Sequence, residues 1–68
     1  MDARGLRCPL PLIRARRALA SLPPGAVLVV LATDPEAPID LAALASDCGR
    51  GFSSVCADGV WRLVLAPE

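Results

Sequence analysis

Three cysteines, at positions 8, 48 and 56, are the side chains of this chain best suited to nucleophilic chemistry. No two of them form a Cys-x-x-Cys pair, and the chain contains no histidine. Cys-His nucleophile pairs, Ser-His-Asp triads and zinc sites with histidine ligands are therefore excluded within one chain. Because an odd number of cysteines makes a poor disulfide framework, we expect free thiols and a reducing compartment.

Cys8 lies in the stretch RGLRCPLPL, among two arginines and two prolines. Proline is favoured at the first helical position, so we expect a helix from Pro9 with Cys8 at or beside its N-cap. The unpaired N–H groups and the dipole at that end favour a thiolate, and the Leu10 amide is the expected donor to the sulfur. With Arg4 and Arg7 nearby, the pattern predicts a pKa for Cys8 lowered from about 8.5 toward 7 or below.

The residues alone leave two interpretations of Cys8 open. A thiol of low pKa without a general base suits exchange chemistry, in which it accepts a sulfane sulfur, forms a mixed disulfide or becomes a sulfenate. Peptide or ester hydrolysis would need a proton shuttle, and the sequence shows none. In the other interpretation, Cys8 is an ordinary small residue before a helix that starts with proline.

Hydrophobic patterning predicts the elements that must position Cys8. Apolar residues at helical spacing indicate a first helix that begins at Pro9 and stops at the SLPPG segment, 21–25. The same spacing indicates a second helix over 38–48, closed by Gly49. One face of each helix is therefore expected to pack on a sheet.

Four strands are predicted around these helices. A short strand at 1–4 comes first, and the apolar run Ala26–Ala32 is typical of a buried central strand. Asp58-Gly59 favours a tight hairpin between strands at 51–57 and 60–66. The expected fold class is an α/β two-layer sandwich of order β-α-β-α-β-β, with two helices packed on one face of a four-stranded mixed sheet.

Composition narrows the class of protein. A chain of 68 residues, 54% of them hydrophobic, is expected to form one domain over 1–68, with no room for a cofactor-binding fold. Seven basic and seven acidic residues balance, and the two aromatic residues are too few to stack bases, so no direct nucleic-acid binding is expected. The longest apolar run is too short to span a membrane, and no signal-peptide pattern opens the chain, which indicates the cytoplasm.

The charged residues support no metal or cofactor site. Asp34, Glu36 and Asp40 lie close in sequence, but without a histidine or a second cluster no metal is expected, and no cofactor is expected either. Arg4 and Arg7 have two interpretations. They steer an acidic partner or stabilise a thiolate, or they are solvated residues beside a turn.

The stretch GLRCPLP, residues 5–11, resembles the Gly-Leu-x-Cys-Pro-x-Pro signature of the TusA (SirA-like) sulfur-carrier family. The likeness continues through LPPG at 22–25, ATDP at 32–35 and Asp40-Leu41 at the start of the second predicted helix. It covers essentially the whole chain. The resemblance implies a two-layer sandwich of the same β-α-β-α-β-β order.

The same resemblance implies a function for Cys8. In this family the motif cysteine carries sulfur as a persulfide, and Pro9, Pro11 and Gly5 would support the motif structurally. Sulfur would come from a donor protein, such as a cysteine desulfurase or a rhodanese-like enzyme, and pass to an acceptor protein. Members serve tRNA thiolation, molybdenum-cofactor formation, sulfur oxidation or selenium handling, which the motif does not separate. We expect a monomer or a weak dimer through an edge strand.

The chain departs from the family pattern in and just after the second predicted helix. Some relatives carry another cysteine in the second helix, where this chain has Ala45, and a Gly-His or Glu-His pair where it has Gly49-Arg50. A two-cysteine mechanism through that helix position is therefore not expected. Cys48 and Cys56 do not replace the missing cysteine by pattern, and both are predicted to be core cysteines.

Two other functions are alternatives to sulfur carriage. In a thiol redox protein, Cys8 would cycle through a sulfenate or a mixed disulfide. In a non-catalytic interaction or regulatory domain, the motif would be only a helix start. A one-sulfur adduct that depends on Cys8 distinguishes carriage from both.

Overall fold

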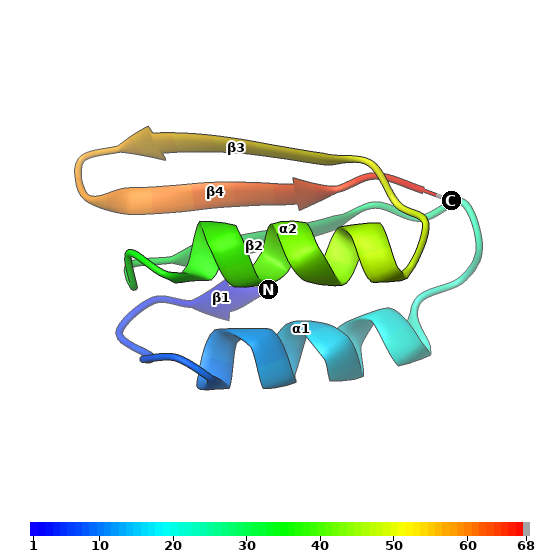
Figure 1. Ribbon diagram of the computed structural model, residues 1–68, viewed down its shortest axis with the longest axis horizontal. Coiled ribbons are helices and arrows are strands. Elements are labelled where there is room, and N and C mark those ends of the chain that lie inside the picture. Colours follow the sequence, from blue (N-terminus) through cyan, green and yellow to red (C-terminus); the bar gives the residue numbers. More distant parts are fainter. Residues whose placement is uncertain (68) are drawn as a thin grey trace.

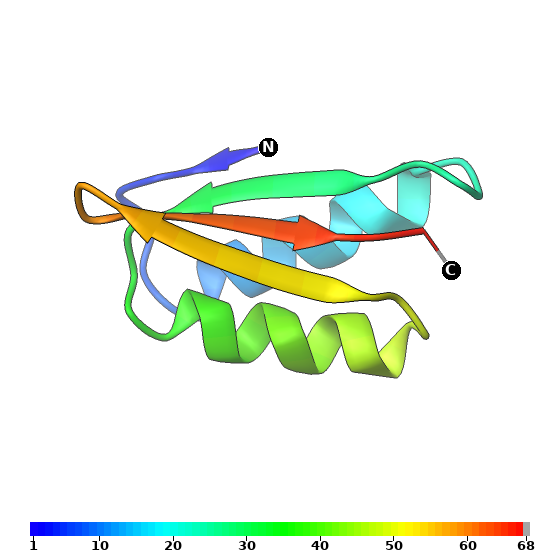
Figure 2. The ribbon, with the colours of Figure 1, turned by 90° about the horizontal axis from the view of Figure 1, so that it is seen from above.

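The computed structural model describes residues 1–67, in which two helices cover one face of a four-stranded sheet (Figure 1). The six elements are β1 (Asp2–Ala3), α1 (Leu10–Ser21), β2 (Leu28–Ala32), α2 (Ala37–Asp47), β3 (Phe52–Ala57) and β4 (Val60–Leu65). Seen from above, both helices lie on the same side of the sheet (Figure 2). The predicted order and the two-layer sandwich are confirmed.

Both helices begin beside a proline, within one residue of the predicted positions. Helix α1 begins at Leu10 rather than Pro9, because Pro9 is its N-cap residue. Helix α2 begins at Ala37, one residue earlier than predicted, and has Asp40 in its first turn. With 12 and 11 residues, neither helix of the described chain has the length and apolar character needed to cross a membrane.

The sheet has the strand order β1-β2-β4-β3, with β1 parallel to β2 and the other neighbours antiparallel. Helix α1 makes the crossover that two adjacent parallel strands require. Along β2 the alternate residues Leu28, Val30 and Ala32 are buried, as a strand with one covered face requires. Val30 pairs with the fully buried Leu63 of β4, so the two central strands share one apolar face.

Asp58 and Gly59 form the hairpin between β3 and β4. Their φ angles are 52° and 75°, and positive φ at both central positions gives the two-residue turn that best matches strand twist. The pairing of Ala57 with Val60 closes the turn directly. The hairpin predicted from the Asp-Gly pair is therefore confirmed.

Strand β3 lies at the edge of the sheet and corrects one prediction about the cysteines. Cys56 is exposed rather than part of the core, because the strand is exposed along its length except at Phe52. Cys48 at the end of α2 is half-buried and packs against the core as predicted, and Trp61 of β4 packs against the same core. Strand period indicates which residues share a face, but an edge strand need not have that face covered.

Arg50 is buried, with 9% of its surface exposed, in the loop between α2 and β3. Its Nη1 donates hydrogen bonds to the carbonyl oxygens of Ala26, at 3.0 Å, and Ala66, at 3.2 Å. These carbonyls belong to the segments just before β2 and just after β4. One guanidinium therefore joins three segments of the sandwich.

Arg50→Ala is expected to lower the free energy of unfolding by about 1.5–3 kcal/mol, because it leaves two part-buried carbonyl groups without their charged donor. Chemical denaturation followed by circular dichroism measures the change. Arg17→Ala, at an exposed position of α1, is the control and is expected to change stability by less than about 0.5 kcal/mol. Equal denaturation midpoints for the two variants would contradict this role of Arg50.

Candidate functional site

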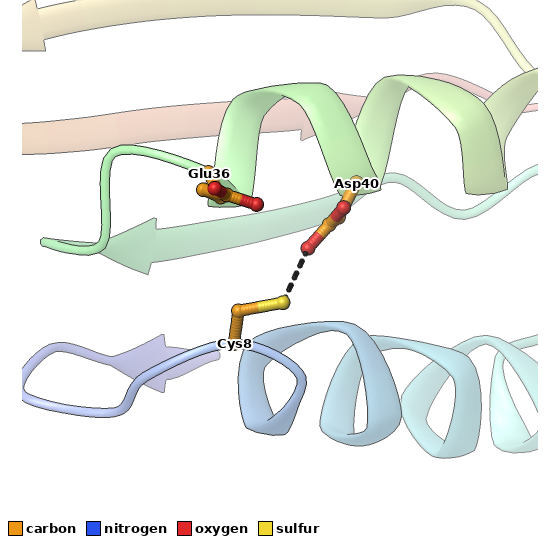
Figure 3. A group of neighbouring side chains, drawn as sticks. All are labelled: Cys8, Glu36 and Asp40. Carbon is orange, nitrogen blue, oxygen red and sulfur yellow. Dashed lines mark hydrogen bonds between the residues drawn. The ribbon is translucent and has the colours of Figure 1, made fainter.

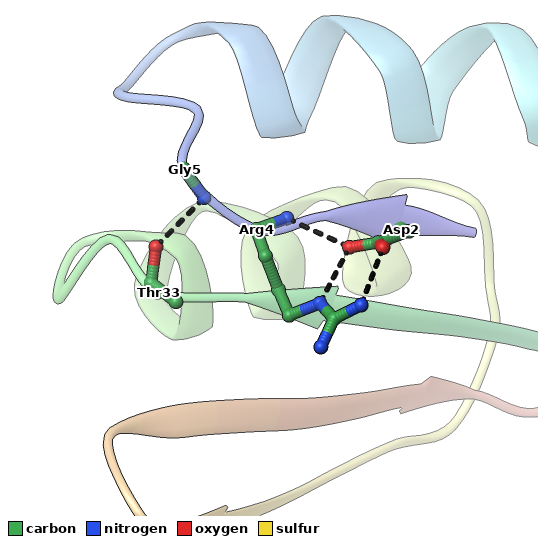
Figure 4. A network of polar contacts seen from close by, with 4 residues as sticks. All are labelled: Asp2, Arg4, Gly5 and Thr33. Carbon is green, nitrogen blue, oxygen red and sulfur yellow. Dashed lines mark hydrogen bonds and ion pairs between the residues drawn. The ribbon is translucent and has the colours of Figure 1, made fainter.

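The loop between β1 and α1 carries Cys8 and is fastened to the end of β2 (Figure 4). Gly5 has a φ of 81°, in the left-handed region that favours glycine, and its N–H donates to Thr33 Oγ1 at 3.0 Å. Arg4 turns back onto Asp2 in an ion pair of 2.8 Å. The hydrogen bonds from Arg4 lower the pKa of Asp2 to about 2, so the Arg4 charge is engaged away from the thiol.

The backbone at Cys8 is held by the loop that joins β2 to α2. The Cys8 N–H donates a hydrogen bond to the carboxylate of Asp34, which also accepts one from the Glu36 N–H at 2.9 Å. These two bonds, with Glu36 contributing more, lower the pKa of Asp34. The prediction that the Leu10 N–H donates a hydrogen bond to the Cys8 sulfur is wrong. This N–H donates to the carbonyl of Arg7 at 2.8 Å, because Pro9 rather than Cys8 caps the helix.

The Cys8 side chain points toward the first turn of α2 (Figure 3). Its Sγ donates a hydrogen bond to Asp40 Oδ2 over 3.1 Å. Glu36 lies close as well, because the sulfur and one oxygen from each of the two carboxylates all lie within 4.8 Å of one another. An ionised carboxylate can only accept hydrogen bonds, so this contact places a proton on the sulfur.

These neighbours set the protonation of the thiol. The hydrogen bond to Asp40, then desolvation and the negative charges of Asp40, Glu36 and Asp34, raise the pKa of Cys8 to about 11. The prediction of a lowered pKa is therefore wrong. That prediction rested on Arg4 and Arg7, which are close to Cys8 in sequence. In the structure, the packing of α1 against α2 instead brings Asp40, 32 positions away, to the sulfur. The sequence signals for Asp40 were its place at the start of the second predicted helix and its closeness to Asp34 and Glu36.

A pocket of about 530 Å³ opens between the Cys8 loop and the loop before α2. Residues 5–8 line one side of it, and residues 33–36 line the other. Cys8 is exposed at this pocket, so its sulfur is accessible to a partner or a small reagent. Cys48 caps the opposite end of α2 and Cys56 lies on β3, so the structure does not bring the three cysteines together.

The acidic neighbours of Cys8 do not define a metal site. The group combines one sulfur with two carboxylates and has no histidine, so it suits no single class of metal ion. The sulfur is also protonated in its contact with Asp40, whereas a thiol that binds a metal must lose its proton. Fold and site together define a small α/β sandwich protein that presents an accessible cysteine thiol beside a helix start.

Comparison with known proteins identifies the family. The family model described as Sulfurtransferase TusA matches residues 1–66. A Neisseria meningitidis serogroup A protein with a provisional sulfur-carrier name is 46% identical over 66 residues, which cover 96% of this chain and 89% of that protein. Sulfur carrier protein TusA of Allochromatium vinosum is 47% identical over 50 residues, which cover 74% of this chain and 66% of that protein. The chain belongs to the TusA family of sulfur carriers.

A solved structure agrees with this assignment. The crystal structure of a SirA-like protein from Desulfitobacterium hafniense has a TM-score of 0.88 and 31% identity, covering 97% of this chain and 92% of that one. This likeness confirms both the fold and the resemblance to the TusA (SirA-like) family. A sulfur-carrier role implies partner proteins that supply and accept sulfur.

Proposed function

We propose that Cys8 accepts a sulfane sulfur as a persulfide and relays it to an acceptor protein. The observation that carries this proposal is the exposed free thiol of Cys8, which lies within the resembling motif and lines a pocket. The other motif residues support that placement. Gly5 shapes the loop, Pro9 caps α1, and Pro11 in the first turn of α1 is fully buried.

The proposed chemistry is an exchange between two sulfur atoms. The Cys8 sulfur, after losing its proton, attacks the terminal sulfur of a donor persulfide, R–S–SH. A new S–S bond forms at Cys8 while the donor S–S bond breaks, and the departing donor thiolate takes up a proton. The net reaction converts Cys8–SH and R–S–SH into Cys8–S–SH and R–SH, without an external oxidant or reductant. Delivery to the acceptor thiol repeats the exchange in the opposite sense.

One observation favours carriage over a redox role that forms a disulfide within the chain. Cys48 lies eight positions beyond Asp40 on α2, about 12 Å along the helix axis at 1.5 Å per residue, so it does not stand beside Cys8 to form a disulfide. This separation suits a thiol that exchanges sulfur with a partner protein.

The proposed partners are a cysteine desulfurase or a rhodanese-like enzyme as donor and a thiol-bearing protein as acceptor. Of the two arginines near Cys8, Arg4 is engaged with Asp2, whereas Arg7 is exposed and lines the pocket. We therefore assign to Arg7, rather than Arg4, a contact with an acidic group of a partner. A stabilising role for either arginine on the thiolate is not proposed, because carboxylates are the groups that surround the sulfur.

Incubation with a cysteine desulfurase and cysteine, followed by intact mass measurement, tests sulfur carriage. The wild-type protein is expected to gain the mass of one sulfur atom and to lose it again with dithiothreitol. Absence of that adduct, together with an oxygen adduct under peroxide, would instead support the redox function. A protein inert to both treatments would be an interaction domain.

A further inference from the structure

The hydrogen bond between Cys8 and Asp40 has a consequence for sulfur release, given the proposed function. We propose that Asp40 is a positioning residue that holds unloaded Cys8 as a neutral thiol and repels the persulfide anion. The loaded and unloaded carriers would then differ in their interaction with one carboxylate. That difference biases the protein toward delivering its sulfur.

The geometry fixes the Asp40 carboxylate beside the sulfur. Asp40 lies in the first turn of α2, where its N–H donates to the carbonyl of Glu36 at 3.0 Å, and its side chain is half-buried. From this backbone position its Oδ2 reaches Cys8 Sγ at 3.1 Å. The carboxylate accepts the thiol proton in the unloaded protein and has no proton of its own to offer a negatively charged sulfur.

The charged groups around the sulfur also disfavour a negative charge on it. Glu36 and Asp34 add negative charge from the start of α2 and the loop before it, and with Asp40 they raise the pKa of Cys8. On the side of β1, the Arg4 guanidinium is engaged with Asp2. After the hydrogen bonds from Glu36 and Cys8, the positive charge of Arg7 also lowers the pKa of Asp34. The sulfur therefore sits in a negative environment.

Loading with sulfur makes the Cys8 side chain more acidic. A persulfide is a stronger acid than the thiol from which it forms, so Cys8–S–SH loses its proton at a lower pH than Cys8–SH does. Once ionised, the loaded protein lacks the S–H hydrogen bond to Asp40 and gains repulsion between two negative groups. Transfer of the outer sulfur to an acceptor restores the neutral thiol and the hydrogen bond.

Asp40→Asn tests this proposal, because it removes the charge and keeps the size of the side chain. The protein is equilibrated at neutral pH with glutathione and glutathione persulfide, and intact mass gives the ratio of loaded to unloaded carrier. We expect that ratio to rise at least about fivefold, the effect of removing one of two unit charges 4 Å apart in water. Asp47→Asn makes the same charge change at an exposed position near the other end of α2, and is expected to leave the ratio unchanged.

A titration of the thiolate provides a second readout that needs no sulfur donor. In a Cys48→Ser/Cys56→Ser background, ultraviolet absorbance is expected to give a pKa of about 11 for Cys8. Asp40→Asn is expected to move this pKa toward the ordinary value of about 8.5. An unchanged ratio and an unchanged pKa in a folded Asp40→Asn protein would overturn the proposal. Failure of the wild-type protein to take up sulfur would instead refute the carrier function, whatever the titration shows.

Discussion

Cys8→Ser is expected to abolish sulfur loading, so that no one-sulfur adduct remains after incubation with a cysteine desulfurase and cysteine. A serine hydroxyl stays protonated at neutral pH and cannot form the S–S bond on which carriage depends. The substitution leaves the fold intact, because Cys8 is exposed and a hydroxyl can also donate to Asp40. Stability is therefore expected to change by less than about 0.5 kcal/mol.

Cys56→Ser is the matched control for this loss. Cys56 is a second exposed free thiol, but it lies on β3, away from the pocket and the α2 carboxylates. The Cys56→Ser variant is expected to take up sulfur to the same extent as the wild-type protein. Equal loading of Cys8→Ser and wild type, or loss of loading in Cys56→Ser alone, would show that the motif cysteine does not carry the sulfur.

Leu41→Ala is expected to lower the free energy of unfolding by about 2–5 kcal/mol, the cost of removing a fully buried leucine and leaving a cavity. A chain of 68 residues has a total stability of only about 3–10 kcal/mol at typical values per residue. The variant should therefore be partly or wholly unfolded at ambient temperature. Thermal and urea denaturation, followed by circular dichroism, measure the loss.

Ile39→Ala is the control on the same helix. Ile39 is 71% exposed and Leu41 is fully buried, although the two lie only two positions apart. The control is expected to change stability by less than about 0.5 kcal/mol, because little apolar surface leaves water at this position on folding. Similar denaturation midpoints for the two variants would contradict the core described for α2.

Much of the fold could be predicted because local patterns carry it. The apolar run before Thr33 gave the central strand, and Asp58-Gly59 gave the hairpin, since both depend on neighbouring residues. The exposure of Cys56 could not be predicted in the same way. Strand period puts Cys56 on the same face as Phe52, and only the place of the strand at the sheet edge explains why that face stays open.

The candidate site, like the fold, could be predicted from the sequence only in part. Cys8 and its motif prolines are contiguous in sequence, so the residues that place the thiol could be named in advance. The groups that set its protonation could not, because Asp40 is 32 positions away and reaches the sulfur only when α1 packs beside α2. Arg4, which is close in sequence, pairs with Asp2 instead. Nearness in the chain was a poor guide to the electrostatics of the sulfur.

Peptide mapping of the loaded wild-type protein locates the sulfur among the three cysteines. Cleavage after arginine separates Cys8 in peptide 8–14, Cys48 in peptide 18–50 and Cys56 in peptide 51–62. After loading and alkylation, the extra sulfur is expected on peptide 8–14 and on neither of the others. Sulfur on peptide 18–50 or 51–62, with peptide 8–14 unmodified, would contradict Cys8 as the carrier residue.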